Sequence, residues 1–197
     1  MPGALVKRQT RIKRQTLLVT PREDERTRAG DGGGSVAAYL SRVRRILPRW
    51  PEEVLREWLH RHPGDHRYAF LDYRRFRFSK VTLSDEATPG AEAFYDGWRA
   101  DFGSNLEERA APLDRRTGLP LDFLAEEMLK RGTWPSPIVV LYNHGGGLHF
   151  PRKLEALKRP LHLLEGHRRL SFLIRLRELG RAAPTHELFI VTLRPPR

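Results

Sequence analysis

The sequence predicts a mixed α/β fold, and the last third of the chain supplies the observations that lead to this class. A continuous apolar run at 137–142 and a strand-like run at 161–164 are followed by a helical pattern over 167–179 and a final apolar run at 188–193. Strand and helix patterns that alternate in this way are typical of a compact α/β unit. A further helical pattern at 121–131, stopped by a glycine, precedes them.

Composition sets the broad class of protein. The 197 residues are 39% hydrophobic, which is enough to fill a core, and they include no cysteine, so a disulfide framework, a thiolate metal site and a cysteine nucleophile are excluded. No apolar run approaches the roughly 20 residues of a membrane span, and the first residues lack a secretory signal pattern. We therefore expect a cytoplasmic protein with no membrane contact.

The net charge of +12 favours an anionic partner. Of the 36 cationic residues, 30 are arginine, the better bidentate partner for phosphate. A coding sequence rich in G and C also raises the arginine count, so the charge alone does not name the partner. Nucleotide and DNA are both compatible with it.

Residues 1–34 are expected to form a disordered, flexible basic tail. Through Arg28 they contain eight cations and three acids, a net +5, and a glycine run follows at 30–34. Such a segment buries little apolar surface and is suited to contacts with the phosphate backbone of DNA. The run at 16–20 is also compatible with a short strand.

Residues 35–66 are predicted to be a helical hairpin. Ser35 is a suitable N-cap for a helix over 35–47, Pro48 ends that helix, and a second helix follows over 51–62. We favour a packing hairpin over a DNA-binding helix-turn-helix, because no recognition-helix pattern is evident. The spacing of three histidines also suits a metal site, but no carboxylate or cysteine completes it, so no metal ligand is assigned; they are His60, His62 and His66.

Residues 67–197 are predicted to form the α/β domain. A strand pattern runs through 68–84, and a Pro/Gly-rich insertion occupies 85–119. Within this domain the segment Glu165 to Arg169 lies where a strand becomes a helix. Gly166 permits a sharp turn, the first helical amides have no intrahelical partner, and Arg168 and Arg169 add positive charge. Together these features favour a phosphate site.

Two segments carry a resemblance to a known family. The segment 136–140 reads SPIVV, and 164–172 reads LEGHRRLSF. Both resemble the ParB/sulfiredoxin superfamily, whose members typically have a helix, a PIVV strand, a strand ending in Gly-x-Arg-Arg and a following helix. The similarity covers roughly the last 75 residues. It implies a small ParB-like core, and sulfiredoxin chemistry is excluded because His167 stands where that enzyme needs cysteine.

The resemblance also implies a function. In ParB proteins the matching segment holds the triphosphate of CTP with Mg²⁺, which would assign Gly166, His167, Arg168 and Arg169 to phosphate contact. Related members include nucleases and a free-serine kinase. This chain departs from ParB proteins because it lacks a good copy of their QPR segment and ends shortly after the core, without their DNA-binding helical domain. A centromere partition protein is therefore not expected.

The leading hypothesis is a ParB-like nucleotide-binding protein that takes CTP or ATP with Mg²⁺ and has a DNA-related role. If it is an enzyme, we expect a nucleotide hydrolase, nuclease or phosphotransferase. Glu165 is then the candidate general base or metal ligand, and His167 a candidate proton shuttle. The plainer interpretation of Glu165 is a charge favoured by its position at a helix terminus. The alternatives are a non-catalytic nucleic-acid-binding protein and a protein-interaction module on the same fold.

Overall fold

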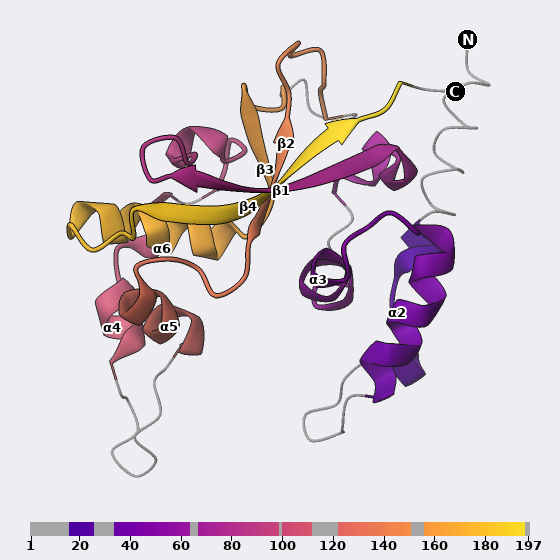
Figure 1. The fold of residues 1–197 in the computed structure, drawn as a ribbon, viewed down its shortest axis with the longest axis horizontal. Coiled ribbons are helices and arrows are strands. Elements are labelled where there is room, and N and C mark those ends of the chain that lie inside the picture. Colours follow the sequence, from indigo (N-terminus) through magenta and orange to yellow (C-terminus); the bar gives the residue numbers. More distant parts are fainter. Residues whose placement is uncertain are drawn as a thin grey trace. The chain divides into compact units, whose positions relative to one another are not determined.

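The chain folds as a mixed α/β protein, as predicted. The computed structural model describes residues 16–25, 34–63, 67–98, 100–111, 122–150 and 156–195. It divides into two compact units, one made of residues 1–78 and 192–197 and the other of residues 79–191. A four-stranded sheet has the strand order β1-β4-β2-β3 (Figure 1). Residues 67–78, which we expected in the α/β domain, belong to the first unit.

The first unit is built on helices and aromatic side chains. Helix α2 (Gly34–Ile46) is followed by α3 (Glu52–Val54), which continues as the π-helical turn η2 (Leu55–His60). This confirms the two helices of the predicted hairpin. The indole of Trp50 lies at the centre of an aromatic cluster, stacked on Phe76 with ring centroids 5.4 Å apart. Aromatic rings in such contact add packing energy beyond the area they bury.

Residues 16–25 correct part of the predicted flexible tail. Residues 16–19 are helical, so the strand expected over 16–20 is absent, and the turn η1 (Glu23–Glu25) follows. Val19 is buried, and its carbonyl accepts a hydrogen bond from the Tyr39 hydroxyl at 3.0 Å. The Glu25 carboxylate is buried and accepts from Arg42 Nε at 2.7 Å. The rest of the predicted tail, residues 1–15 and 26–33, lies outside the described residues.

The strand pattern at 68–84 is only half confirmed. Strand β1 runs over Phe76–Ser84, whereas the preceding residues form the short turns η3 (Ala69–Leu71) and η4 (Tyr73–Arg75). Asp72 separates the two turns with φ +60°, and its carboxylate accepts from the Arg74 amide at 3.3 Å. A residue in the left-handed region interrupts an extended strand, which explains the later start of β1.

The central strand of the sheet is β2 (Ile138–Tyr142), which the sequence predicted at 137–142. It pairs antiparallel with β3 (Leu161–Glu165) and parallel with β4 (Thr185–Leu193). Strand β4 begins three residues before the predicted apolar run. The first four residues of β2 are buried, as expected for a strand covered on both faces.

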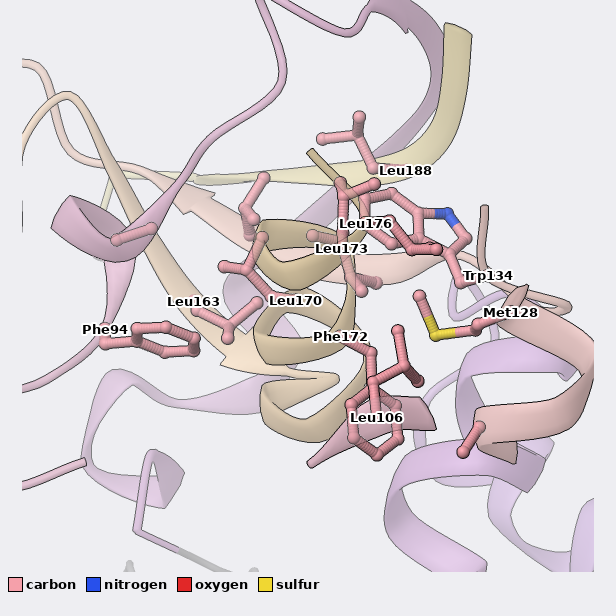
Figure 2. Packing of buried hydrophobic residues seen from close by; sticks show 14 residues of the cluster. Phe94, Leu106, Met128, Trp134, Leu163, Leu170, Phe172, Leu173, Leu176 and Leu188 are labelled. Atoms are coloured by element: carbon pink, nitrogen blue, oxygen red, sulfur yellow. The ribbon is translucent and has the colours of Figure 1, made fainter. Parts of the chain in front are cut away.

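Helices pack beside this sheet in the second unit. Helix α5 (Phe123–Arg131) begins at the cap residue Asp122 and ends at Gly132, and α6 (His167–Glu178) matches the predicted helix at 167–179. The short helix α4 (Leu106–Ala110) lies beside α5. Figure 2 shows side chains of α6 packed with Phe94, Leu106, Met128 and Trp134. The described part of the insertion, with turns η5 (Ala91–Ala93) and η6 (Ala100–Gly103), therefore contributes to the core.

Within the described ranges, no helix combines the length and the apolar character needed to cross a bilayer.

Candidate functional site

Gly166 forms the turn between β3 and α6. Its φ of +100° and ψ of 28° place it in the left-handed region, where side chains are strained. A Cβ at this position would lie 2.5 Å from Ile138 Cγ2 and 3.0 Å from Ile138 Cβ. Both the backbone angle and the lack of space therefore require glycine. No side chain caps the start of α6.

Arg169 lies on the first turn of α6, and its side chain makes hydrogen bonds within the protein. Its Nη2 donates to Glu165 Oε1 at 3.0 Å, and its Nη1 faces the Ser136 Oγ, the Ser136 carbonyl and the Pro137 carbonyl at 2.6, 2.8 and 3.0 Å. Both side chains of the ion pair are largely buried. Arg169 thus fastens the start of α6 to the segment before β2. This geometry suits a brace between elements better than the phosphate contact we expected of Arg169.

The Glu165 carboxylate is engaged in the ion pair with Arg169. It lies at the end of β3 and is the acceptor for Arg169 on the first turn of α6, and the residue is 9% exposed. A general base needs an acceptor oxygen within reach of the substrate's proton. The pairing with Arg169 instead gives Glu165 a structural partner, in line with the plainer interpretation of a charge at a helix terminus.

The ring of His167 is packed among aromatic side chains. Its centroid lies 4.8 Å from that of Trp98, 5.4 Å from Tyr95 and 6.1 Å from Phe94. These three residues come from the segment that the sequence marked as a Pro/Gly-rich insertion. The imidazole is buried, as is Phe94, so it contributes packing at the start of α6.

Arg168 is the exposed cation of the motif. Its side chain is 45% exposed, and Nη2 is hydrogen bonded to Asp122 Oδ2. Arg109 Nη1 approaches the same oxygen at 3.8 Å. Both guanidinium groups also lie over the ring of Phe102, at 4.9 Å for Arg109 and 5.7 Å for Arg168. Two arginines from different elements therefore meet at one carboxylate.

The polar side chains further along α6 are only partly exposed to solvent. Ser171 is buried, donates to the His167 carbonyl at 2.9 Å and accepts from Trp98 Nε1 at 3.0 Å. Arg175, further along, pairs with Glu107 at 2.8 Å and Glu178 at 2.9 Å. These carboxylates raise the pKa of the Arg175 guanidinium, Glu107 contributing most. Arg175 thus has two carboxylate partners of its own, whereas Arg168 shares the Asp122 carboxylate with Arg109.

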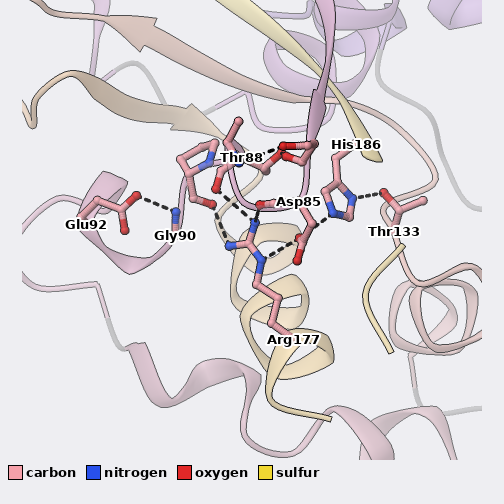
Figure 3. Close-up of polar contacts among 10 residues, drawn as sticks. Asp85, Thr88, Gly90, Glu92, Thr133, Arg177 and His186 are labelled. Atoms are coloured by element: carbon pink, nitrogen blue, oxygen red, sulfur yellow. Dashed lines mark hydrogen bonds and ion pairs between the residues drawn. The ribbon is translucent and has the colours of Figure 1, made fainter. Parts of the chain in front are cut away.

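A second polar cluster was not found from the sequence (Figure 3). Asp85 Oδ1 accepts from His186 Nε2 and from Arg177 Nε, both at 2.8 Å, and His186 Nδ1 lies 2.7 Å from the Thr133 hydroxyl. Burial would raise the pKa of the Asp85 carboxyl, but hydrogen bonds from Arg177 and His186 outweigh this and lower it. Burial lowers the pKa of His186 below its ordinary value of 6.5, and Asp85 opposes this only in part.

This cluster holds chain segments together. Arg177 Nη2 also donates to the carbonyls of Asp85 and Thr88, at 2.6 and 3.1 Å. Four segments meet at this cluster: the end of β1, the end of α6, the start of β4 and the residue after Gly132. The residues are up to 101 positions apart in sequence, so no local pattern announces them.

The histidine and carboxylate side chains of the described residues bear on metal binding. Within them, no group of three or more histidine, aspartate or glutamate side chains is arranged to hold a metal ion. His60 Nε2 lies 2.9 Å from the Glu25 carbonyl and its ring packs on Tyr39, while His66 lies outside the described residues. At the motif, Glu165 and Asp122 are both paired with arginine. Pairing with arginine makes these two carboxylates poor direct ligands for Mg²⁺.

No family model matches the chain, and comparison with curated proteins and with solved structures gives no significant match. The ParB/sulfiredoxin resemblance stays a prediction that rests on the motif residues.

Proposed function

We propose that this chain is a ParB-like nucleotide-binding protein that holds phosphate at the junction of β3 and α6. The single observation that carries the proposal is the exposed Arg168 on the first turn of α6, next to Gly166 and within reach of Arg109. Guanidinium groups bind phosphate oxygens through charge-assisted hydrogen bonds. The elements that the resemblance implies, a helix, a strand, a second strand and a helix, occur in that order as α5, β2, β3 and α6.

The contacts within the motif narrow the expected roles. Arg168 is the phosphate contact in this proposal, and Gly166 gives the backbone its turn. Arg169 and Glu165 maintain the junction, and His167 packs beneath it. The proposal therefore concerns binding, because both candidate catalytic side chains are engaged by the protein.

The proposed ligand is a nucleoside triphosphate, CTP or ATP, with Mg²⁺ carried by its phosphates. The proposed role is DNA-related and cytoplasmic, and the net charge of +12 supports an additional polyanion contact. When a protein binds DNA by neutralising its phosphates, the logarithm of the binding constant falls linearly with the logarithm of the salt concentration. A DNA mobility shift that persists unchanged at high salt would exclude this electrostatic contact.

A thermal-shift measurement tests the nucleotide proposal. CTP, ATP and GTP are added to the full chain with and without Mg²⁺, and cytidine and adenosine serve as controls that lack phosphate. A ligand that binds only the native state at 100 times its Kd adds about 2.7 kcal/mol to the free energy of unfolding, so Tm rises. We expect a triphosphate to raise Tm and its nucleoside to leave it unchanged. If no triphosphate raises Tm above the value of the ligand-free chain, the proposal is contradicted.

A further inference from the structure

We infer that Arg109, Arg168 and Asp122 form an anion site in which the Asp122 carboxylate occupies the position that a phosphate group takes. This inference deepens the proposed function and rests on it. It adds Arg109 as a second phosphate ligand from outside the motif. It also assigns Asp122 as a competitor within the chain that reduces the affinity of the site.

The two oxygens of Asp122 have different partners. Oδ1 caps α5 by accepting from the amides of Leu124 at 3.1 Å and Ala125 at 3.4 Å. Oδ2 is hydrogen bonded to Arg168 and lies 3.8 Å from Arg109 Nη1. The cap and the ion pairs thus depend on separate atoms. A ligand that replaces Oδ2 between the arginines leaves the cap of α5 in place.

The charges at this place do not balance. Among the residues that the structure describes, the two guanidinium groups share the one carboxylate of Asp122, which leaves an excess positive charge. Arg109 Nε donates in addition to Asn105 Oδ1 at 2.9 Å, which fixes the direction of its side chain. The ring of Phe102 contacts both guanidinium groups and restricts their movement. The pair is therefore oriented before any ligand arrives, which lowers the ordering cost of binding.

Solvent reaches the two cations. The side chain of Arg168 is 45% exposed and that of Arg109 is 34% exposed, whereas Asp122 is 9% exposed. An incoming anion meets the guanidinium groups first. A terminal phosphate offers three oxygens and up to two negative charges, so it satisfies both arginines better than one carboxylate oxygen. The site therefore favours a phosphate group over a ligand with a single carboxylate.

The test compares Asp122→Asn with the unmodified chain by calorimetric titration with inorganic pyrophosphate. Asparagine caps a helix as well as aspartate does, so α5 keeps its cap while the competing charge is removed. The expected result is tighter pyrophosphate binding by up to about fivefold, the range for removal of an ion pair whose arginine is partly exposed. If Asp122→Asn fails to fold, Asp122→Ser makes the same comparison, because serine is also an N-cap residue.

Glu107→Gln is the matched control. This substitution removes one of the two carboxylates that pair with Arg175, which lies on α6 as Arg168 does. It changes the net charge by the same +1. We expect this control to leave pyrophosphate affinity unchanged. An equal gain in both variants would show a general charge effect and overturn the inference, as would no gain in Asp122→Asn.

Arg109→Gln and a nucleotide titration separate this inference from the proposed function. We expect Arg109→Gln to weaken pyrophosphate binding roughly tenfold, as the loss of a charge-assisted hydrogen bond implies. If CTP or ATP binds the unmodified chain but neither Asp122→Asn nor Arg109→Gln changes the affinity, the inference fails and the proposed function stands. If pyrophosphate responds to both substitutions and no nucleotide binds, the anion site stands and the proposed function fails.

Discussion

Arg169 and Glu165 form a buried ion pair across the junction of β3 and α6, with 3.0 Å between Nη2 and Oε1. The same guanidinium reaches the carbonyls of Ser136 and Pro137 just before β2. One side chain therefore ties together the two segments that carry the family resemblance. This relationship makes Arg169 part of the framework that presents Arg168.

The first prediction concerns this pair. Arg169→Ala removes the arginine charge beside the buried Glu165 carboxylate and the hydrogen bonds to two carbonyls, so the free energy of unfolding should fall by about 3–5 kcal/mol. Arg131→Ala is the control, because Arg131 forms an i,i+4 pair with Glu127 on an exposed surface. That loss should cost less than about 1 kcal/mol. Urea unfolding of both variants measures the difference, and equal losses would show that Arg169 is not a brace.

The second prediction concerns Gly166. Gly166→Ala combines a positive φ, which costs an L-residue about 1–2 kcal/mol, with overpacking against Ile138, which costs about 1–3 kcal/mol. Gly180→Ala is the matched control, since Gly180 has φ +64° but open space around the added Cβ. We expect Gly166→Ala to lower the free energy of unfolding by at least about 1 kcal/mol more than Gly180→Ala. The same or a smaller loss would contradict the steric argument.

The third prediction concerns pH and His186. Because burial lowers the pKa of His186 in the folded protein, the unfolded chain binds more protons than the folded one just below pH 6.5. Its contribution to stability is therefore complete above about 6.5 and is lost as the pH falls towards the folded-state pKa. Asp85, whose pKa is also lowered, adds a further loss below its ordinary value of 3.8.

The measurement is the free energy of unfolding at about pH 7.5 and at about pH 5.5. We expect the decrease between these values to become smaller in His186→Gln, which has no titrating ring. His62→Gln removes an exposed histidine and should retain the decrease of the unmodified chain. If His186→Gln shows the full decrease, the buried imidazole is not its source.

The fourth prediction concerns Glu25 in the first unit. The Arg42 hydrogen bond lowers the pKa of the Glu25 carboxyl, and burial opposes this only in part. Glu25→Ala removes three hydrogen bonds to the carboxylate, two from Arg42 and one from the Arg22 amide, and should lower the free energy of unfolding by about 2–3 kcal/mol. Glu57→Ala, which breaks the exposed pair with Arg61, should cost less than about 1 kcal/mol. Similar losses in chemical denaturation would mean that residues 16–25 contribute little to the fold.

The sequence predicted the second unit's main elements well because their signals are local. Gly166 and Gly132 mark the start and the end of helices, and the apolar runs of β2 and β3 lie within a few residues of their predicted bounds. The turns before β1 were missed because they depend on the left-handed conformation of Asp72, which its neighbours do not announce.

Contacts between distant residues account for what the sequence did not predict. The order of residues 16–25 depends on Arg42 and Tyr39, which lie on a later helix. At the candidate site, the sequence predicted that the motif residues lie together, but it could not distinguish a phosphate contact from a structural brace among them. Arg168 and Arg169 look equivalent in sequence, and only the positions of Asp122 and Ser136, 46 and 33 residues earlier, distinguish them.

The most direct test of the central claim is calorimetric titration of CTP, ATP and GTP with Mg²⁺ into the full chain and two folded variants, Arg168→Gln and Arg175→Gln. Arg168 lies on the first turn of α6, whereas Arg175 lies about 10 Å further along the axis and is matched by two carboxylates. The account predicts that a triphosphate binds the unmodified chain, that Arg168→Gln weakens it roughly tenfold or more, and that Arg175→Gln leaves it unchanged. Equal affinities in all three proteins, or no heat of binding with any nucleotide, would contradict it.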